Sequence, residues 1–182
     1  MNLLFDLDDT LHDKKASLYG YALSLWESNS LQIESERNDF IDVFVNENLI
    51  IQPKIEVFDK LRVQFHIPSK LASQMLNDFD GTFHEFSVAF PDSLSVLHFL
   101  KNKGVKIACV TNGRDFFQRN KISALGFEPY FDAIVTSGGL GVKKPNPHIF
   151  LESLRLLGFV HDTTCFCGDS LRAETIPIPL TN

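Results

Sequence analysis

Three carboxylates and a hydroxyl stand close together near the start of the chain, in the run Asp6-Leu7-Asp8-Asp9-Thr10. Asp6 and Asp8 are separated by one residue, so both can approach a single reacting centre. Two carboxylates that close repel each other unless a cation neutralises them or one of them keeps its proton. Mg²⁺ is a hard cation that takes oxygen ligands. One carboxylate can then act as a nucleophile while the other transfers protons, and the Thr10 hydroxyl can bond the turn.

This acidic run directly follows a short apolar stretch, Leu3-Leu4-Phe5, which predicts a buried β-strand. In open α/β sheets the ligand site lies beyond the carboxyl ends of the strands. The carboxylates therefore stand where such a fold places its chemistry. The alternative is a solvated acidic turn after an edge strand, because motifs this short also occur by chance.

A second polar cluster, Thr111-Asn112-Gly113, follows an apolar run over residues 105–110 that predicts another strand. The hydroxyl of Thr111 or the amide of Asn112 can donate to a phosphoryl oxygen, and Gly113 lets the backbone approach closely. Asn-Gly is also a strong turn signal, so an ordinary turn explains this cluster equally well when it is taken alone.

Two further clusters add a cation and a carboxylate. Lys143-Lys144-Pro145 follows a glycine-rich stretch that we expect to be a flexible loop. A fixed lysine stabilises the negative charge that spreads over a phosphoryl group during its transfer, although both lysines could also be surface charges before a helix. Gly168-Asp169-Ser170 follows a predicted strand over residues 163–167. Asp169 can complete a magnesium site with Asp6, because Mg²⁺ needs few protein ligands.

The elements that position these clusters alternate between strand and helix. Residues 1–12 and 87–182 carry short apolar runs separated by amphipathic stretches, which predicts a Rossmann-like α/β domain whose parallel sheet has helices on both faces. Asn146 and Gly158 predict the beginning and end of one of these helices. Residues 13–86 show only helical periodicity, in four sets of apolar positions. We therefore expect a cap of four helices inserted into the α/β domain.

The composition limits the classes of function. The chain has 182 residues, of which 44% are hydrophobic, and this suffices for one domain with a small insert. The formal net charge of −6 argues against a general nucleic-acid surface. No apolar run approaches the length of a membrane span, and the N-terminus lacks the features of a signal peptide. Cys109, Cys165 and Cys167 stand in apolar runs, so we expect reduced core thiols and a cytoplasmic protein.

Taken together and in this order, the four clusters resemble the motifs of the haloacid dehalogenase-like (HAD) superfamily, in its Asp-x-Asp-x-Thr phosphatase form with a helical cap. The resemblance extends over most of the chain. It implies that Asp6 attacks phosphorus to form an aspartyl-phosphate. It also implies that Asp8 protonates the leaving alcohol and then activates water. Thr111, Asn112 and Lys144 match the positions that bind the phosphoryl group of the substrate.

The same resemblance implies a Mg²⁺ ion held by Asp6, Asp169 and the backbone carbonyl of Asp8. Dehalogenases of the superfamily usually lack an acid at the position of Asp8, so its presence favours phosphate-ester chemistry over carbon–halogen cleavage. The implied substrate is a small phosphorylated metabolite. We expect a monomer or a homodimer, with neither a nucleic-acid polymer nor a membrane as partner. His12 and Arg114 stand next to the first two clusters, where each could contact a leaving group or lie in an exposed loop.

Two alternatives to a phosphatase stay open. A phosphomutase of the same superfamily uses the same four clusters, and a truncated, non-catalytic binding protein fits the unusual C-terminus. Glu174 stands where the superfamily often has a second Asp, and Pro177 and Pro179 forbid a regular helix or a central strand there. We therefore expect that the last strand of the superfamily is missing. The exposed sheet edge beside residues 163–167 would then favour a dimer.

Overall fold

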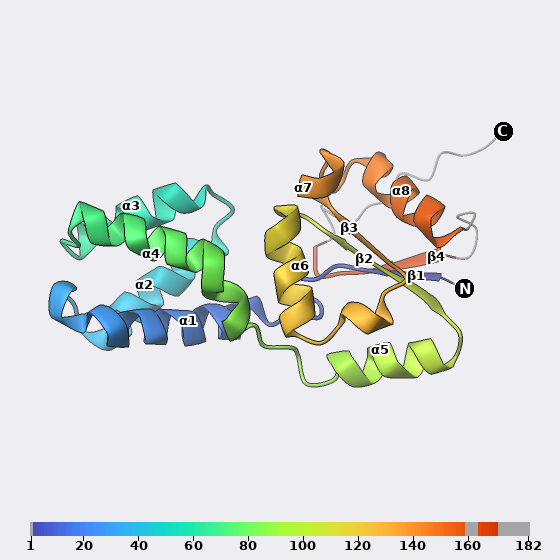
Figure 1. The fold of residues 1–182 in the computed structure, drawn as a ribbon, viewed down its shortest axis with the longest axis horizontal. Helices are drawn as coiled ribbons and strands as arrows, with labels where there is room; N and C mark the ends of the chain where they lie inside the picture. The colour runs from blue at the N-terminus through green and yellow to red at the C-terminus, as the bar shows by residue number, and fades with distance from the viewer. Residues whose placement is uncertain (1, 159–163, 171–182) are drawn as a thin grey trace. The chain divides into compact units, whose positions relative to one another are not determined.

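A computed structural model describes residues 2–158 and 164–170, and the chain divides into two compact units (Figure 1). Met1–Asp13 and Ala89–Asn182 belong to the first unit, and Lys14–Val88 forms the second. The second unit is thus an insertion in the sequence of the first. Glu174 and the rest of the C-terminal tail, on which we based the missing strand and the exposed edge, lie outside the described residues.

A parallel sheet forms the centre of the first unit. Within the described residues it has four strands, in the order β3-β2-β1-β4. These are β1 (Asn2–Phe5), β2 (Lys106–Thr111), β3 (Ala133–Thr136) and β4 (Thr164–Cys167). Phe5 pairs with Cys109 of β2 and with Cys167 of β4, so the carboxyl ends of these three strands meet at one edge of the sheet. The α/β class with a parallel sheet, predicted from the alternation of strand and helix, is confirmed.

Helices cover both faces of this sheet (Figure 1). The helices are α5 (Ser93–Asn102), α6 (Asp115–Ala124), the short α7 (Ser137–Leu140) and α8 (Pro147–Leu157), with a 3₁₀ turn at Glu128–Tyr130. Leu3 and Phe5 pack on the side of α5 and α6, whereas Leu4 packs against α8. Alternating residues of β1 thus face two separate cores, which is why this strand is apolar throughout.

Local sequence signals explain how two of these helices begin. The Asn146 side chain accepts a hydrogen bond of 2.9 Å from the backbone N–H of His148, and Gly158 ends α8 at a φ of 73°. The stretch over residues 137–141, expected to be a flexible loop, instead contains α7. Thr136 caps this helix by accepting a 3.0 Å hydrogen bond from the N–H of Gly139. The glycines of this stretch indicated a loop and gave no sign of this cap.

The second unit is entirely helical in its regular structure. It contains α1 (Lys14–Asn29), α2 (Arg37–Leu49), α3 (Lys54–Gln64) and α4 (Ser69–Thr82), with 3₁₀ turns at Ser30–Gln32 and Phe83–Phe86. Aromatic rings form its core: the Phe79 ring lies 5.2 Å from that of Tyr21 and 4.8 Å from that of Phe83, between ring centroids. Such ring pairs add to the stability that burial alone provides.

The two ends of the helical insertion are joined within the first unit. His12 and Ala89 form an antiparallel β-bridge, and the N–H of Phe90 donates to the carbonyl of Leu11 at 3.1 Å. The Ser93 hydroxyl donates to the same carbonyl at 2.9 Å. The chain segments before and after the insertion are therefore hydrogen-bonded to each other within the first unit.

The three cysteines differ in how far they are buried. Cys109 is buried, as expected for a core thiol, but Cys165 is exposed and Cys167 is half-buried. All three are free thiols. The expectation of three core thiols is therefore wrong for Cys165. Among the described helices, none has both the length and the apolar character to cross a bilayer.

Replacing Phe79 by alanine should lower the free energy of unfolding of the helical unit by about 3–5 kcal/mol, because the change leaves a cavity among packed rings. Urea denaturation followed by circular dichroism measures this change. Leu31→Ala is the matched control, since Leu31 is fully exposed whereas Phe79 is 1% exposed. The control should change the stability by less than about 0.5 kcal/mol. Equal effects of the two substitutions would contradict the assignment of the core.

Candidate active site

The turn after β1 holds the first two carboxylates in place through backbone bonds. The N–H of Asp6 donates to the carbonyl of Cys167 on β4 at 2.9 Å. The carbonyl of Leu7 accepts bonds of 3.0 Å from both Leu11 and His12, which closes the turn. The Thr10 hydroxyl, expected to bond this turn, has no hydrogen-bond partner among the described residues. Backbone groups therefore define the turn.

Asp6 is nearly buried and pairs directly with Lys144. The distance from Asp6 Oδ2 to Lys144 Nζ is 2.6 Å, and Asp6 Oδ1 accepts a 2.7 Å bond from the N–H of Leu7. Burial raises the pKa of Asp6, although the charge and hydrogen bond of Lys144 and the Leu7 N–H act in the opposite direction. The Asp6 carboxylate is thus held in a fixed orientation in surroundings that do not favour its charge.

The side chain of Asn112 fixes the backbone of Lys144. Asn112 Oδ1 accepts a 2.8 Å bond from the N–H of Lys144, and Asn112 Nδ2 donates to the carbonyl of Lys144 at 3.2 Å. Lys144 is 3% exposed, whereas Lys143 is exposed. The lysine directly before Pro145 is therefore the one that reaches Asp6, as the motif indicated. Asn112, expected to bind substrate, here holds the segment that delivers Lys144.

Asp8 is bound on one oxygen by two basic side chains. Its Oδ1 lies 2.7 Å from Nδ1 of His12 and 2.5 Å from Nζ of Lys121. Burial by itself favours the neutral acid, but the charge of Lys121 and the contact with His12 outweigh it and hold the pKa of Asp8 well below its usual range. His12 is fully buried and bonds Asp8, so the alternative that it lies in an exposed loop is wrong.

Gln118 connects Asp8 with Thr111. Gln118 Nε2 donates to Thr111 Oγ1 at 2.6 Å and makes a longer contact of 3.4 Å with Asp8 Oδ2. Thr111 is the last residue of β2 and is buried. Because Thr111 Oγ1 accepts from Gln118, its own O–H hydrogen can donate to a phosphoryl oxygen.

Two glycines allow the segment after β2 to lie against α7. Gly113 has a φ of 150°, and its carbonyl accepts a 2.8 Å bond from the N–H of Gly138. A Cβ on Gly138 would lie 2.7 Å from that carbonyl oxygen, which is too close for any larger residue without a backbone shift. The close approach keeps the Thr111 cluster next to the segment that leads to Lys144.

Asp169 follows β4, the strand that neighbours β1 on the side away from β2. Along the chain, β2 and β3 are added on one side of β1, and β4 is then added on the other side. Open α/β sheets bind their ligands where the order of strands changes side in this way. The side chain of Asp169 is exposed and the carboxylate of Asp6 is fixed one strand away, so both can offer oxygen atoms to a hard cation. Over residues 2–158 and 164–170, no three His, Cys, Asp or Glu side chains already cluster as a metal site. These oxygen donors fit a hard divalent cation that keeps most of its ligands as water or substrate.

Gln118 and Lys121 are functional candidates that the sequence analysis missed. Both are buried on the face of α6 that also carries Ile122. In the sequence they resemble ordinary polar helix positions, since helical spacing does not say what a face will contact. One feature of the sequence could have indicated them. The predicted helix begins directly after the Thr111 cluster, so its buried face has to lie near the strand ends. Arg114, in contrast, is exposed, with its guanidinium 5.1 Å from the centroid of the Phe117 ring.

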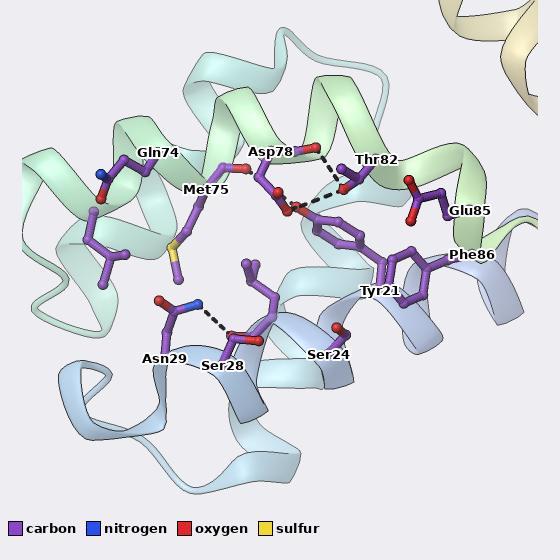
Figure 2. Close-up of a pocket in the computed structure, with 12 residues that line it drawn as sticks. Tyr21, Ser24, Ser28, Asn29, Gln74, Met75, Asp78, Thr82, Glu85 and Phe86 are labelled. Atoms are coloured by element: carbon purple, nitrogen blue, oxygen red, sulfur yellow. Dashed lines mark hydrogen bonds between the residues drawn. The ribbon is translucent and has the colours of Figure 1, made fainter.

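The helical unit has a cavity of its own, of about 460 Å³, between α1 and α4 (Figure 2). Figure 2 shows the hydroxyl of Tyr21 next to Asp78, to which it donates at 2.9 Å. Met75 and Glu85 also line this cavity. None of the residues predicted to do chemistry lines it, so the candidate active site is the cluster at the strand ends.

The chain is similar to a known protein family and to several named phosphatases. The model of the haloacid dehalogenase-like hydrolase family matches residues 3–174. The glyceraldehyde 3-phosphate phosphatase of Methanothermobacter thermautotrophicus is 30% identical, over 96% of this chain and 79% of the relative. The phosphoglycolate phosphatase of Aquifex aeolicus is 27% identical, over 92% of this chain and 75% of the relative.

Solved structures share this fold. A HAD phosphatase from Thermococcus onnurineus superposes with a TM-score of 0.62 at 23% identity, covering 95% of this chain and 79% of its own. A HAD-superfamily hydrolase of subfamily IA from Geobacter sulfurreducens superposes with a TM-score of 0.67 at 18% identity, covering 94% and 79%. These similarities extend over both units of the chain.

Replacing Asn112 by alanine should speed hydrogen exchange of the Lys144 amide by about five- to tenfold, because the change removes a hydrogen bond of about 1 kcal/mol. Exchange measured by NMR at that amide tests this effect. Asn102→Ala, at an exposed position at the end of α5, is the control and should leave the Lys144 amide unchanged. An unchanged rate in Asn112→Ala would show that Asn112 does not hold this segment.

Proposed function

The chain belongs to the haloacid dehalogenase-like hydrolase family, and we propose from this that it hydrolyses the phosphate monoester of a small metabolite. One observation carries the proposal: the Asp6 carboxylate, at the carboxyl end of the central strand β1, pairs with Lys144 at 2.6 Å. This pair provides a nucleophile and, beside it, a cation for the phosphoryl group. The neighbouring Asp8 provides a group that can transfer protons.

In the proposed reaction, Asp6 and Asp8 act in turn. An oxygen of Asp6 attacks phosphorus, the bond from phosphorus to the ester oxygen breaks, and an aspartyl-phosphate forms. Lys121 and His12 hold the pKa of Asp8 low, so Asp8 has to bind a proton before this step, and it then gives that proton to the leaving alcohol. Asp8 then takes a proton from water, which attacks phosphorus, so that inorganic phosphate leaves and the Asp6 carboxylate is restored. Each proton that Asp8 gives in the first step returns to it in the second.

Lys144 and Thr111 are proposed to bind the phosphoryl oxygens. The charge of Lys144 offsets the repulsion between Asp6 and an anionic ester, and it stabilises the charge of the transition state. Thr111 can donate its hydroxyl hydrogen, since its oxygen already accepts a bond from Gln118. Asn112 contributes by holding the backbone of Lys144 on both its N–H and its carbonyl.

A Mg²⁺ ion would be held by Asp6, Asp169 and the backbone carbonyl of Asp8. It would supply positive charge next to the nucleophile and to the phosphoryl oxygens. Burial raises the pKa of Asp6 despite the pair with Lys144, and this supports the proposed cation site. A second cation near this carboxylate favours its ionised form, which is the form that attacks.

The substrate is proposed to be a small phosphorylated metabolite, as the names of the curated relatives suggest. Glyceraldehyde 3-phosphate and phosphoglycolate are the substrates in those names. The helical unit Lys14–Val88 is inserted directly after the turn of Asp6 and Asp8, and we assign it the role of a lid that limits water and selects the leaving group. The curated relatives support hydrolysis over a phosphomutase, and release of inorganic phosphate distinguishes the two.

Asp6→Asn should reduce the release of inorganic phosphate from phenyl phosphate with Mg²⁺ by more than about 10³-fold, because an amide is a poor nucleophile. Asp92→Asn, at an exposed position before α5, should retain the wild-type rate within about twofold. A phosphate assay under saturating Mg²⁺ measures both. Turnover by Asp6→Asn at the control rate would remove Asp6 from its proposed role.

Chelation with EDTA should abolish this activity, and added Mg²⁺ should restore it. Loss of an outer-shell partner alone typically costs about 10–100-fold in metal affinity, so Asp169→Asn should raise the Mg²⁺ concentration for half-maximal rate at least as much. Titration of the rate against Mg²⁺ gives this value, with Asp92→Asn as the control. An Asp169→Asn titration that coincides with the wild type would exclude Asp169 as a ligand.

A further inference from the structure

We infer that Lys121 is a positioning residue: it fixes the carboxylate of Asp8 so that Oδ2 is the oxygen that exchanges a proton with the leaving alcohol. This inference rests on the proposed phosphatase function and adds a residue to it. The motifs that identify the reactive groups do not include Lys121, which lies in the last turn of α6.

The contacts of the two Asp8 oxygens are unequal. Lys121 Nζ lies 2.5 Å and His12 Nδ1 lies 2.7 Å from Oδ1, so this oxygen is occupied twice. Oδ2 receives only the longer contact of 3.4 Å from Gln118 Nε2 among the described residues. A group that transfers a proton needs an oxygen that can approach the ester, and Oδ2 is the oxygen with room for this contact.

The position of Oδ2 relative to Thr111 supports the same assignment. Gln118 Nε2 donates to Thr111 Oγ1 at 2.6 Å and also faces Asp8 Oδ2. Both oxygens are therefore close to one nitrogen atom. Thr111 is proposed to bind the phosphoryl group, so Oδ2 lies on the side of Asp8 where the ester would bind. Oδ1 instead lies toward the buried ammonium of Lys121.

The burial of Lys121 makes it suited to fixing a neighbour. Its side chain is 3% exposed, and that of His12 is completely buried. A buried ammonium requires a close anionic partner, because its desolvation is costly unless it is paired. Lys121 Nζ also lies 5.5 Å from the centroid of the Phe117 ring, which limits where the amine can move. The ion pair therefore restricts the side-chain rotation of Asp8, and misplacement of a reacting group by about 1 Å can cost about 10²-fold in rate.

A series of phosphate esters with different leaving groups tests the inference. Phenyl phosphate has a poor leaving group that needs a proton, whereas 2,4-dinitrophenyl phosphate has a good one that does not. Lys121→Met should lower kcat/KM about 10²-fold for phenyl phosphate and less than about threefold for the dinitrophenyl ester. The ratio kcat/KM is used because it reports only the steps up to transfer to Asp6. Lys121→Arg, which keeps the charge, should recover most of the phenyl phosphate activity.

A double-mutant cycle links the effect to Asp8. In an Asp8→Asn background, adding Lys121→Met should change kcat/KM for phenyl phosphate less than about twofold, because the group being positioned is already lost. Lys103→Met, at an exposed position, controls for loss of a lysine and should match the wild type. If Lys121→Met does not fold by circular dichroism, Lys121→Gln replaces it with the same expected ratio between esters.

The outcomes separate this inference from the function on which it rests. Equal losses for both esters, or full additivity with Asp8→Asn, would show that Lys121 binds the phosphoryl group or only stabilises the fold, and would overturn the inference. If the wild-type protein hydrolyses neither ester with Mg²⁺ present, the proposed function itself fails. A wild type that hydrolyses both, with a selective loss in Lys121→Met, supports both.

Discussion

Asp6 and Asp8, two of the three carboxylates on the turn after β1, are each neutralised by a lysine, and the rest of the site depends on this arrangement. Lys144 pairs with Asp6 across 2.6 Å, and Lys121 pairs with Asp8 across 2.5 Å. All four groups are largely withdrawn from water, so the loss of either cation would leave a poorly solvated charge. Lys121 comes from α6, after β2, and Lys144 follows β3 and α7. Both β2 and β3 therefore have to take their places in the sheet before the acidic turn is stable.

The surroundings of the two carboxylates differ, which allows chemically similar groups to have different tasks. Burial raises the pKa of Asp6, whereas Lys121 and His12 hold that of Asp8 low. In the proposed reaction Asp6 has to be ionised, and positive charge in addition to that of Lys144 would favour this form. The position of Asp169, one strand away across the reversal of strand order, is where a divalent cation would provide this charge.

Much of the fold and part of the site could be predicted because the signals are local. Apolar runs that end in polar clusters located β1, β2 and β4, and Asn146 marked the beginning of α8. The residues that were missed depend on contacts distant in sequence: Lys121 lies 113 residues from Asp8. Helical spacing indicated that α6 has a buried face, but only the folded chain shows that this face meets an anion. The same limit applies to His12, which is buried and forms a backbone bridge with Ala89, 77 residues away in the sequence.

The bridge between His12 and Ala89 ties together the two ends of the helical insertion. Because the backbone leaves after Asp13 and returns at Ala89, two points tied to each other within the first unit, the reactive strand ends do not rely on what lies between them in sequence. A change in the number or length of the inserted helices would therefore leave the pairing of β1 and the turn of Asp6 and Asp8 in place. Selectivity for one metabolite over another would then evolve in one module and the chemistry in the other.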